Sequence, residues 1–145
     1  MNIDVMFSSK TDQWATPQKF FDELNNEFNF VLDAAADESN HKCEQYYSKQ
    51  DDGLNQSWQI GGNAYCNPPY GREIGKWVQK GFTESLHGGG TIVMLLPART
   101  DTKWFHDFVL GKAEIRFVKG RLKFGDSKNS APFPSMVVVF YGHNE

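Results

Sequence analysis

The segment TIVMLLP, at positions 91–97, contains seven consecutive residues without a charged side chain. Unbroken apolar runs of this length, rich in branched side chains, are typical of a strand that is covered on both faces. Such a strand belongs to the interior of a layered domain with helices packed on its sheet. The run therefore favours an α/β domain built on a mostly parallel sheet.

Helical and extended patterns alternate around this run. Thr16 is expected to cap a helix that starts at Pro17 and buries apolar side chains as far as Phe28. Residues 72–86 and 100–110 have the same helical spacing of apolar residues. Strands are expected at 30–33, 62–66, 91–97, 114–118, 121–124 and 135–141, and 45–48 is a candidate for a further short one. This order predicts a mostly parallel sheet that ends in a C-terminal antiparallel hairpin.

One compact domain is expected to account for residues 1–145. A chain of 145 residues with 39% apolar residues can bury one core but not two comfortable ones. No apolar run approaches the roughly 18 to 20 residues of a membrane helix, and the N-terminus lacks a signal-peptide pattern. We therefore expect a cytoplasmic monomer that does not bind membranes, with residues 1–11 flexible.

Cysteine and histidine usage favours neither a disulfide scaffold nor a metal site. The two cysteines, Cys43 and Cys66, lack the paired spacing of a zinc site, and the four histidines are scattered along the chain. We therefore expect no metal in this protein.

The net charge of −3 hides an asymmetry between the two ends of the chain. Residues 1–60 hold four Lys and Arg against eleven Asp and Glu, whereas residues 99–145 hold eight against five. The basic residues of EIRFVKGRLKFGDSK, at 114–128, alternate with aromatic and apolar ones. This pattern fits a nucleic-acid surface, where cations meet phosphates and rings stack on bases. It fits equally well a hairpin with one solvated charged face and one buried aromatic face.

The segment YCNPPYG, at 65–71, combines an amide, two prolines and an aromatic side chain directly after a predicted strand. The prolines fix two φ angles and remove two backbone donors, so the backbone around Asn67 is stiff. The Asn67 side-chain oxygen and the Pro68 carbonyl can then both accept hydrogen bonds from an incoming amino group, which favours its lone pair as a nucleophile. Tyr70 offers a flat face for the ring that carries the amine. The alternative is that the segment only ends a strand and Tyr70 packs in the core.

The predicted sheet favours the functional interpretation. Asp33 and Asn67 both follow predicted strands at their carboxyl ends. Ligands of open α/β sheets bind beyond the carboxyl ends of the strands. These two side chains are therefore expected to contribute to one site.

Several segments together resemble a known family. They are WATPQKFFDEL, FNFVLDAAADESNHKC, DDGLNQSW, YCNPPYG, IVMLLPARTDTKWFH, GRLKFG and APFPSMVVVF, in one consistent order from about residue 12 to residue 141. The chain is similar to the small Dam-like DNA adenine amino-methyltransferases of bacteriophages and prophages. The resemblance implies a Rossmann-like class I methyltransferase fold in a bacterial host cell, and methyl transfer from S-adenosylmethionine to the exocyclic amine of adenine in DNA. The base would be flipped out of the duplex, and the reaction would be a direct in-line displacement.

The resemblance also assigns roles to individual residues. Asn67, Pro68, Pro69 and Tyr70 would form the catalytic loop, in which Asn67 and the Pro68 carbonyl hold the amine and Tyr70 stacks on the base. The expected cofactor residues are Trp14, Thr16 and Pro17 in WATPQ, Asp33, Ala34 and Ala35 in LDAAAD, and Asp52, with Asp51 as the alternative to Asp52. Backbone N–H groups near Thr16 and Pro17 would meet the methionine carboxylate, and Asp33 would meet the amino group.

Two departures distinguish the chain from larger methyltransferases of this type. Alanines replace the glycine-rich turn after the first strand, and because alanine does not readily adopt positive φ, the turn must differ in shape. The chain also has no room for a separate target-recognition domain. Arg99, Arg121 and Lys123 are therefore the candidates for contacts with DNA.

Two alternative functions stay open on the sequence alone. The same chemistry can act on an RNA base or on the glutamine amide of a release factor, because both present a similar amino group. The chain can also be a non-catalytic nucleic-acid-binding remnant that has lost its cofactor. The recognition sequence on the DNA is not encoded in any motif that we identify.

Overall fold

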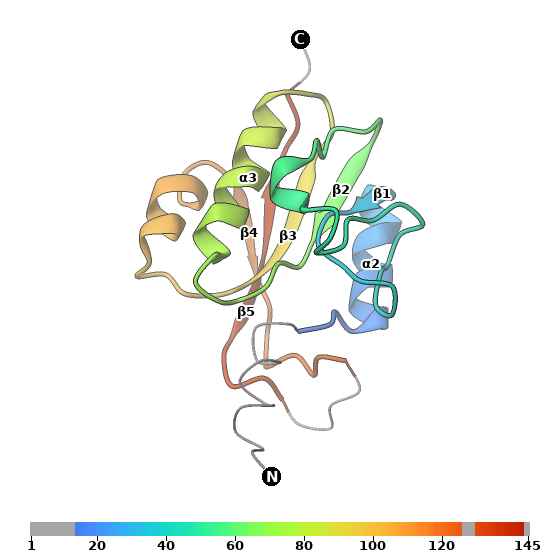
Figure 1. Cartoon of the computed structure of the whole chain (residues 1–145). Coiled ribbons are helices and arrows are strands. Elements are labelled where there is room, and N and C mark those ends of the chain that lie inside the picture. The colour runs from blue at the N-terminus through green and yellow to red at the C-terminus, as the bar shows by residue number, and fades with distance from the viewer. Residues whose placement is uncertain (1–13, 126–129, 144–145) are drawn as a thin grey trace.

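Strand β3 (Ile92–Pro97) lies at the centre of a five-stranded sheet, and all six of its residues are buried. The computed structural model describes residues 14–125 and 130–143 (Figure 1). The strand order is β1-β2-β3-β5-β4. The other strands are β1 (Phe30–Asp33), β2 (Asn63–Cys66), β4 (Glu114–Phe117) and β5 (Ser135–Phe140).

Strand directions agree with the predicted mixture. Strands β1, β2 and β3 pair in parallel, and β5 pairs antiparallel with both β3 and β4. The carboxyl ends of β1, β2 and β3 therefore meet at one edge of the sheet. The expectation of an α/β fold with a mostly parallel sheet and a C-terminal antiparallel pair is confirmed at this level.

Helices cover both faces of the sheet, as the apolar run of β3 requires. In-register neighbours share a face, so Tyr65 of β2 and Val93 of β3 point to one side. Helix α2 (Gln18–Phe28) packs on that side, where the Phe21 ring lies 5.1 Å from the Tyr65 ring, centroid to centroid. Helix α3 (Ile74–Leu86) packs on the opposite side through Gly81, next to Met94.

Several elements differ from the sequence-based expectations. Helix α2 begins at Gln18 with Pro17 as its N-cap residue, and Thr16 does not cap it, because its hydroxyl is hydrogen-bonded elsewhere. Residues 121–124 do not form the expected strand. The candidate strand at 45–48 is reduced to a bridge between Tyr46 and Asp33.

The helical segment near residue 105 also differs from an ordinary α-helix. Element η2 (Phe105–Val109) is a π-helical turn, in which the Leu110 N–H donates to the Phe105 carbonyl five residues back at 2.8 Å. A short 3₁₀ turn, η1 (Gly53–Asn55), follows the polar connection after β1.

Two expectations concern the terminal segments and membranes. The expected flexibility of residues 1–11 lies outside the described residues, as does Lys128 of the basic segment. Among the helices of residues 14–125 and 130–143, none has the length and apolar character to cross a membrane.

Glycines 75 and 81 of α3 test the packing of this helix on β3. A Cβ atom added at Gly81 would lie 2.6 Å from Met94 Sδ, whereas at Gly75 the nearest atoms belong to Trp104 at 3.7 Å. We expect Gly75→Ala to raise the free energy of unfolding by up to about 1 kcal/mol, because alanine loses less backbone entropy in a helix. Gly81→Ala should not stabilise, and Gly81→Val should cost about 1–3 kcal/mol by displacing Met94. Urea unfolding measures each change, and equal stabilisation by alanine at both positions would contradict this packing.

Candidate functional site

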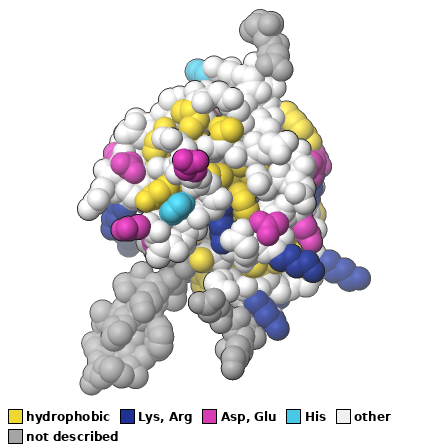
Figure 2. Space-filling view, turned by 90° about the vertical axis from the view of Figure 1, so that its right-hand side faces the viewer, with side chains coloured by type: hydrophobic (Ala, Val, Ile, Leu, Met, Phe, Trp, Pro, Cys, Tyr) yellow, Lys and Arg dark blue, Asp and Glu magenta, His cyan; other side chains and the backbone are white. Residues whose placement is uncertain are grey.

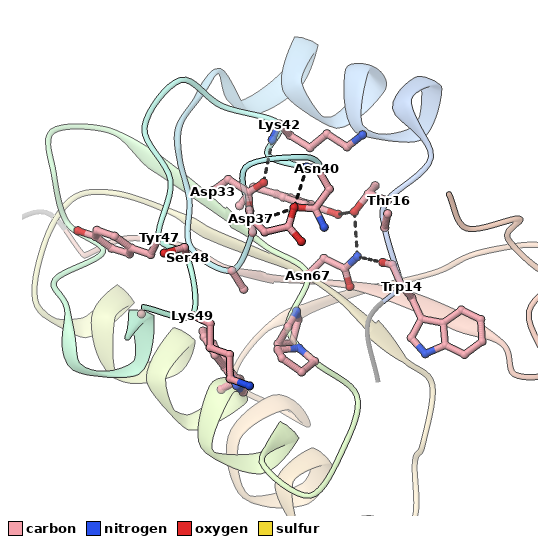
Figure 3. Close-up of a pocket in the computed structure, with 18 of the residues that line it drawn as sticks. Trp14, Thr16, Asp33, Asp37, Asn40, Lys42, Tyr47, Ser48, Lys49 and Asn67 are labelled. Carbon is pink, nitrogen blue, oxygen red and sulfur yellow. Dashed lines mark hydrogen bonds between the residues drawn. The ribbon is translucent and has the colours of Figure 1, made fainter. Parts of the chain in front are cut away.

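A pocket of about 420 Å³ lies at the carboxyl edge of β1 and β2. Asp33 ends β1, and Asn67 directly follows β2, so the parallel pairing of the two strands brings them to one place (Figure 3). The pocket is lined by Trp14, Ala15, Thr16, Asp33, Ala35, Ala36, Asp37, Asn40, Lys42, Tyr47, Ser48, Lys49, Asp52, Gly53, Tyr65, Asn67, Pro68, Pro69 and Trp77.

The Asp33 carboxylate is buried and only half satisfied. The side chain is 3% exposed, and its Oδ2 accepts a hydrogen bond from the Lys42 N–H at 2.9 Å. Its Oδ1 has no hydrogen-bond partner among the described residues. Burial raises the pKa of Asp33 from 3.8 to about 6, against the opposing effects of the Lys42 and Ala35 backbone N–H groups. Of these two, only the Lys42 N–H has the distance and angle of a hydrogen bond to the carboxylate. A buried carboxylate oxygen without a donor is prepared to bind a cationic group.

The turn after β1 accommodates alanines without backbone strain. No residue from 34 to 37 has positive φ. The Asp37 carboxylate closes the turn by accepting hydrogen bonds from the Ser39 and Asn40 N–H groups at 2.8 and 3.0 Å. Gly53 packs so closely on this turn that an added Cβ would lie 2.5 Å from the Ala34 carbonyl oxygen. The turn therefore forms without positive φ, and Gly53, from a later segment, packs directly on it.

The Asn67 side chain is held by its amide nitrogen. Nδ2 donates to the Trp14 carbonyl and, at 3.0 Å, to Thr16 Oγ1 (Figure 3). Thr16 Oγ1 in turn shares a hydrogen bond of 2.6 Å with the Tyr65 hydroxyl. Asn67 Oδ1 is buried and has no partner in the part of the chain that the structure describes. The acceptor end of the amide is thus left for a ligand.

Tyr70 lies outside the pocket. Its side chain is 4% exposed, and its hydroxyl donates to the Leu95 carbonyl at 2.8 Å. The edges of Phe124 and Phe133 contact its ring, with centroid distances of 6.4 and 5.6 Å. In this structure Tyr70 packs in the core, which is the alternative that the sequence left open.

The expected cofactor residues divide into two groups. Five of them, Trp14, Thr16, Asp33, Ala35 and Asp52, line the pocket. Ala34 is fully buried, and neither Ala34 nor Pro17 lines the pocket, so a contact of either residue with the cofactor stays a prediction. Pro17 itself has no N–H, so the free N–H groups near it begin at Gln18.

Asp51 and Asp52 can be told apart in the structure. Asp51 Oδ2 accepts hydrogen bonds from the Ser48 N–H and hydroxyl at 2.8 and 3.0 Å, which lower the pKa of Asp51. Its carboxylate therefore closes a local turn, and it is absent from the pocket wall. Asp52 does line the pocket, and its φ of 60° places it at the entrance to η1.

Arg99, Arg121 and Lys123 are exposed and do not line the pocket. Arg121 makes one long contact, from Nη1 to the Ala131 carbonyl at 3.5 Å. Figure 2 shows basic and acidic side chains interspersed on the face that carries α2 and β1, around yellow apolar surface. The basic residues named here are thus available to an external partner but are not part of the pocket itself.

Sequence reasoning missed much of the pocket wall between residues 36 and 53. Tyr47 reaches the pocket because its N–H donates to the Asp33 carbonyl, while its own carbonyl accepts from Ala36 N–H, both at 3.0 Å. Ser48 and Lys49 follow on the same edge. The candidate strand at 45–48 could have identified these residues. If it pairs with β1, its last residues must lie beside Asp33. Trp77 of α3 had no such signal.

Metal ligands do not cluster in the described residues. Within residues 14–125 and 130–143, no group of three or more His, Cys, Asp or Glu side chains is arranged to hold a metal ion.

Comparisons with known proteins match most of this chain. The family described as DNA N-6-adenine-methyltransferase (Dam) matches residues 5–142. The DNA N-6-adenine-methyltransferase of Escherichia phage T1 is 35% identical over 113 residues, which are 77% of this chain and 46% of that protein. The DNA N-6-adenine-methyltransferase of Haemophilus phage HP1 is 32% identical over 140 residues, which are 91% of this chain and 80% of that protein. This chain thus spans about half the length of the T1 relative, and it belongs to the DNA N-6-adenine-methyltransferase (Dam) family.

Proposed function

We propose that this chain transfers a methyl group from S-adenosylmethionine to the exocyclic amine of adenine in DNA, on a Rossmann-like class I methyltransferase fold. The observation that carries the proposal is a pair of buried acceptor oxygens without partners, Asp33 Oδ1 and Asn67 Oδ1, on two residues that line one pocket. Unpaired buried polar atoms are costly to a fold, and a ligand that supplies the missing donors removes that cost. The third such atom among the described residues, Ser135 Oγ, does not line the pocket. The carboxylate oxygen Asp33 Oδ1 suits an ammonium group, and the amide oxygen Asn67 Oδ1 suits a neutral amine.

The pocket has the size and chemistry for the cofactor. Its volume of about 420 Å³ lies within the usual range of small-molecule sites. Asp33 would hold the amino group of the methionine part, and Asp52 the ribose or adenine. The first N–H groups of α2, from Gln18 onwards, are free of helical hydrogen bonds and suit the carboxylate. When bound, S-adenosylmethionine supplies an electrophilic methyl group on its sulfonium.

The Asn67 amide and the Pro68 carbonyl would bind the amine that receives the methyl group. Each accepts one N–H of the amine, and neither Pro68 nor Pro69 has a backbone donor that could compete. With both protons held, the nitrogen lone pair is turned towards the methyl carbon. The new N–C bond forms as the C–S bond breaks, and one amine proton then leaves to solvent. Positioning of the two reactants supplies most of the rate acceleration.

Tyr70 would stack on the flipped adenine only if its covering rings move. Phe133 is half-buried, whereas Phe124 is 5% exposed, so Phe133 is the contact that yields more readily. Flipping the base out of the duplex costs a few kcal/mol, which contacts with the base and the phosphates must offset. Arg99, Arg121 and Lys123 are exposed and suit phosphate contacts.

The family favours DNA over the other substrates of this chemistry. Both relatives compared above are named as DNA adenine methyltransferases, which argues against an RNA base or a glutamine amide. Two unpaired buried acceptors in one pocket cost stability, and in a non-catalytic remnant no bound cofactor or amine would offset that cost.

The Asn67→Ala variant tests the proposed chemistry. We expect methylation of unmethylated duplex DNA to fall at least about 100-fold, because one of the two acceptors that hold the amine is lost. Incubation with labelled S-adenosylmethionine, followed by digestion and identification of the methylated nucleoside, measures the effect. Parallel reactions with RNA and with a release factor test the alternatives. Label in glutamine or in RNA, or methylation of DNA unchanged in Asn67→Ala, would contradict the proposal.

Cofactor affinity is expected to depend on the charge of Asp33. Its pKa is about 6 in the free protein, so at pH 5 only about a tenth of the molecules carry the carboxylate. We therefore expect binding of S-adenosylmethionine to weaken roughly tenfold between pH 7.5 and pH 5, with the loss starting near pH 6. Isothermal titration across this range measures it. In Asp33→Asn, binding should be weak at every pH, and a profile that still follows pH near 6 would assign the titration to another group.

The same carboxylate is expected to destabilise the free protein. A pKa raised from 3.8 means that the folded state disfavours the charged form, so this cost is absent at low pH and appears as the pH rises from about 4 to 6. At pH 7.5, Asp33→Asn should raise the free energy of unfolding by about 2–3 kcal/mol in the absence of cofactor. Urea unfolding checks this, with the exposed Asp22→Asn as the matched control that should change little.

A further inference from the structure

The orientation of the Asn67 amide is fixed by its neighbours. The two ends of an asparagine amide have nearly the same shape, so hydrogen-bond partners decide which end faces which way. A backbone carbonyl can only accept, so the contact of Asn67 with the Trp14 carbonyl requires the nitrogen to be on that side. The oxygen is therefore turned away from Trp14, towards the place where an amine must be accepted.

A second contact holds the same end of the amide. The other proton of Asn67 Nδ2 is donated to Thr16 Oγ1 at 3.0 Å. Thr16 is 4% exposed, and its hydroxyl shares a 2.6 Å hydrogen bond with the Tyr65 hydroxyl. Tyr65 is 1% exposed, belongs to β2 and packs against the Phe21 ring. Strand β2 thus fixes the Tyr65 hydroxyl, which is hydrogen-bonded to Thr16 Oγ1. Thr16 Oγ1 in turn accepts the hydrogen bond from Asn67 Nδ2.

We propose that Thr16 and Tyr65 are positioning residues that keep Asn67 Oδ1, rather than Nδ2, directed at the amine to be methylated. The inference rests on the proposed function, because it concerns the same amine. If the amide turned over, its two N–H groups would face the N–H groups of the amine, and the amine could not be held. Both contacts of Nδ2 come from residues 14–16, far from Asn67 in the sequence, so this short segment sets the orientation of the amide.

This role differs from the one that the sequence suggests for Thr16. A helix-capping or cofactor-binding threonine would have its hydroxyl directed at free N–H groups or at the ligand. Here both hydrogen bonds of the Thr16 hydroxyl stay within the protein, one to Asn67 and one to Tyr65. Thr16 lines the pocket, but its polar atom is engaged in holding the amide.

Kinetics of three threonine variants test the inference. We expect Thr16→Val to lower the single-turnover methylation rate about tenfold at saturating S-adenosylmethionine, with cofactor Kd changed less than twofold. Thr16→Ser keeps the hydroxyl and should keep the rate. Thr91→Val is the matched control. The Thr91 hydroxyl also accepts a partly buried hydrogen bond, from the Gly142 N–H at 3.1 Å, but Thr91 precedes β3, at the end of the strand away from the pocket. A Thr16→Val protein with weakened cofactor binding and a normal rate at saturation would overturn the positioning role.

Non-additivity provides a second kinetic check. If Thr16 acts only through Asn67, then Thr16→Val should cause no further loss of rate in an Asn67→Ala protein, and Tyr65→Phe should behave in the same way. Independent, multiplicative losses would show that these side chains act on the reaction by another route.

A spectroscopic readout separates this inference from the proposed function. In ¹⁵N-labelled protein, the side-chain amide signals that vanish in Asn67→Ala belong to Asn67. We expect both of its protons to exchange slowly with solvent, and Thr16→Val to accelerate the exchange whereas Thr91→Val does not. Fast exchange in the unaltered protein would overturn the inference even if adenine is methylated. If no adenine is methylated, the proposed function fails, and the exchange still decides how Asn67 is oriented.

Discussion

Parallel pairing of β1 with β2 is the constraint on which the pocket depends. The register sets Asp33 opposite Tyr65, so the first polar residue at the end of β1 and the first one after β2 emerge at the same edge. The short segment at 45–47 extends this arrangement by bonding to Asp33 on the other side. Because side chains alternate between the two faces of a sheet, a shift of one residue in register would point Asp33 to the opposite face. The buried β3 and its two covering helices keep that register in place.

The buried polar side chains of Asp33 and Asn67 lower the stability of the free fold and leave acceptor atoms for a ligand. Asp33 Oδ2 and Asn67 Nδ2 have hydrogen-bond partners, whereas Oδ1 of each residue is buried without one. The fold therefore bears part of the cost of dehydrating these two side chains. The surrounding hydrogen bonds limit this cost to one atom on each side chain and determine which atom remains free. An ammonium group bound at Asp33 and an amine bound at Asn67 would recover this cost at the two positions. Affinity is then gained at acceptor atoms that are already in place.

The two prolines and the aromatic residue of the loop have different relations to the pocket. Pro68 and Pro69 line it and stiffen the backbone that aims Asn67, as their chemistry predicts. Tyr70, in contrast, is bound to the Leu95 carbonyl and covered by Phe124 and Phe133. In the basic C-terminal segment, Phe124 therefore packs inward, whereas Phe117 is 64% exposed. Its Arg116 is half-buried and ion-paired with Glu27 and Glu114, while Lys119, Arg121 and Lys123 are exposed. The expected hairpin does not form in that segment, because residues 121–124 are not a strand and β4 pairs with β5 instead. A nucleic-acid surface there stays a prediction.

The sequence by itself determined the α/β class, the central buried strand, the two helices α2 and α3 that precede it, and the positions of Asp33 and Asn67 at strand ends. These features follow from periodicity, from proline chemistry and from motifs, all of which are local. It did not determine that Thr16 holds Asn67 instead of capping α2, that Tyr70 is packed, or that residues 121–124 leave the sheet. Only the tertiary structure decided these points, because they depend on contacts between residues far apart in the sequence. Thr16 contacts Tyr65, 49 positions away, and Tyr70 contacts Leu95, 25 positions away. Side chains with several possible partners take the one that folding brings nearest.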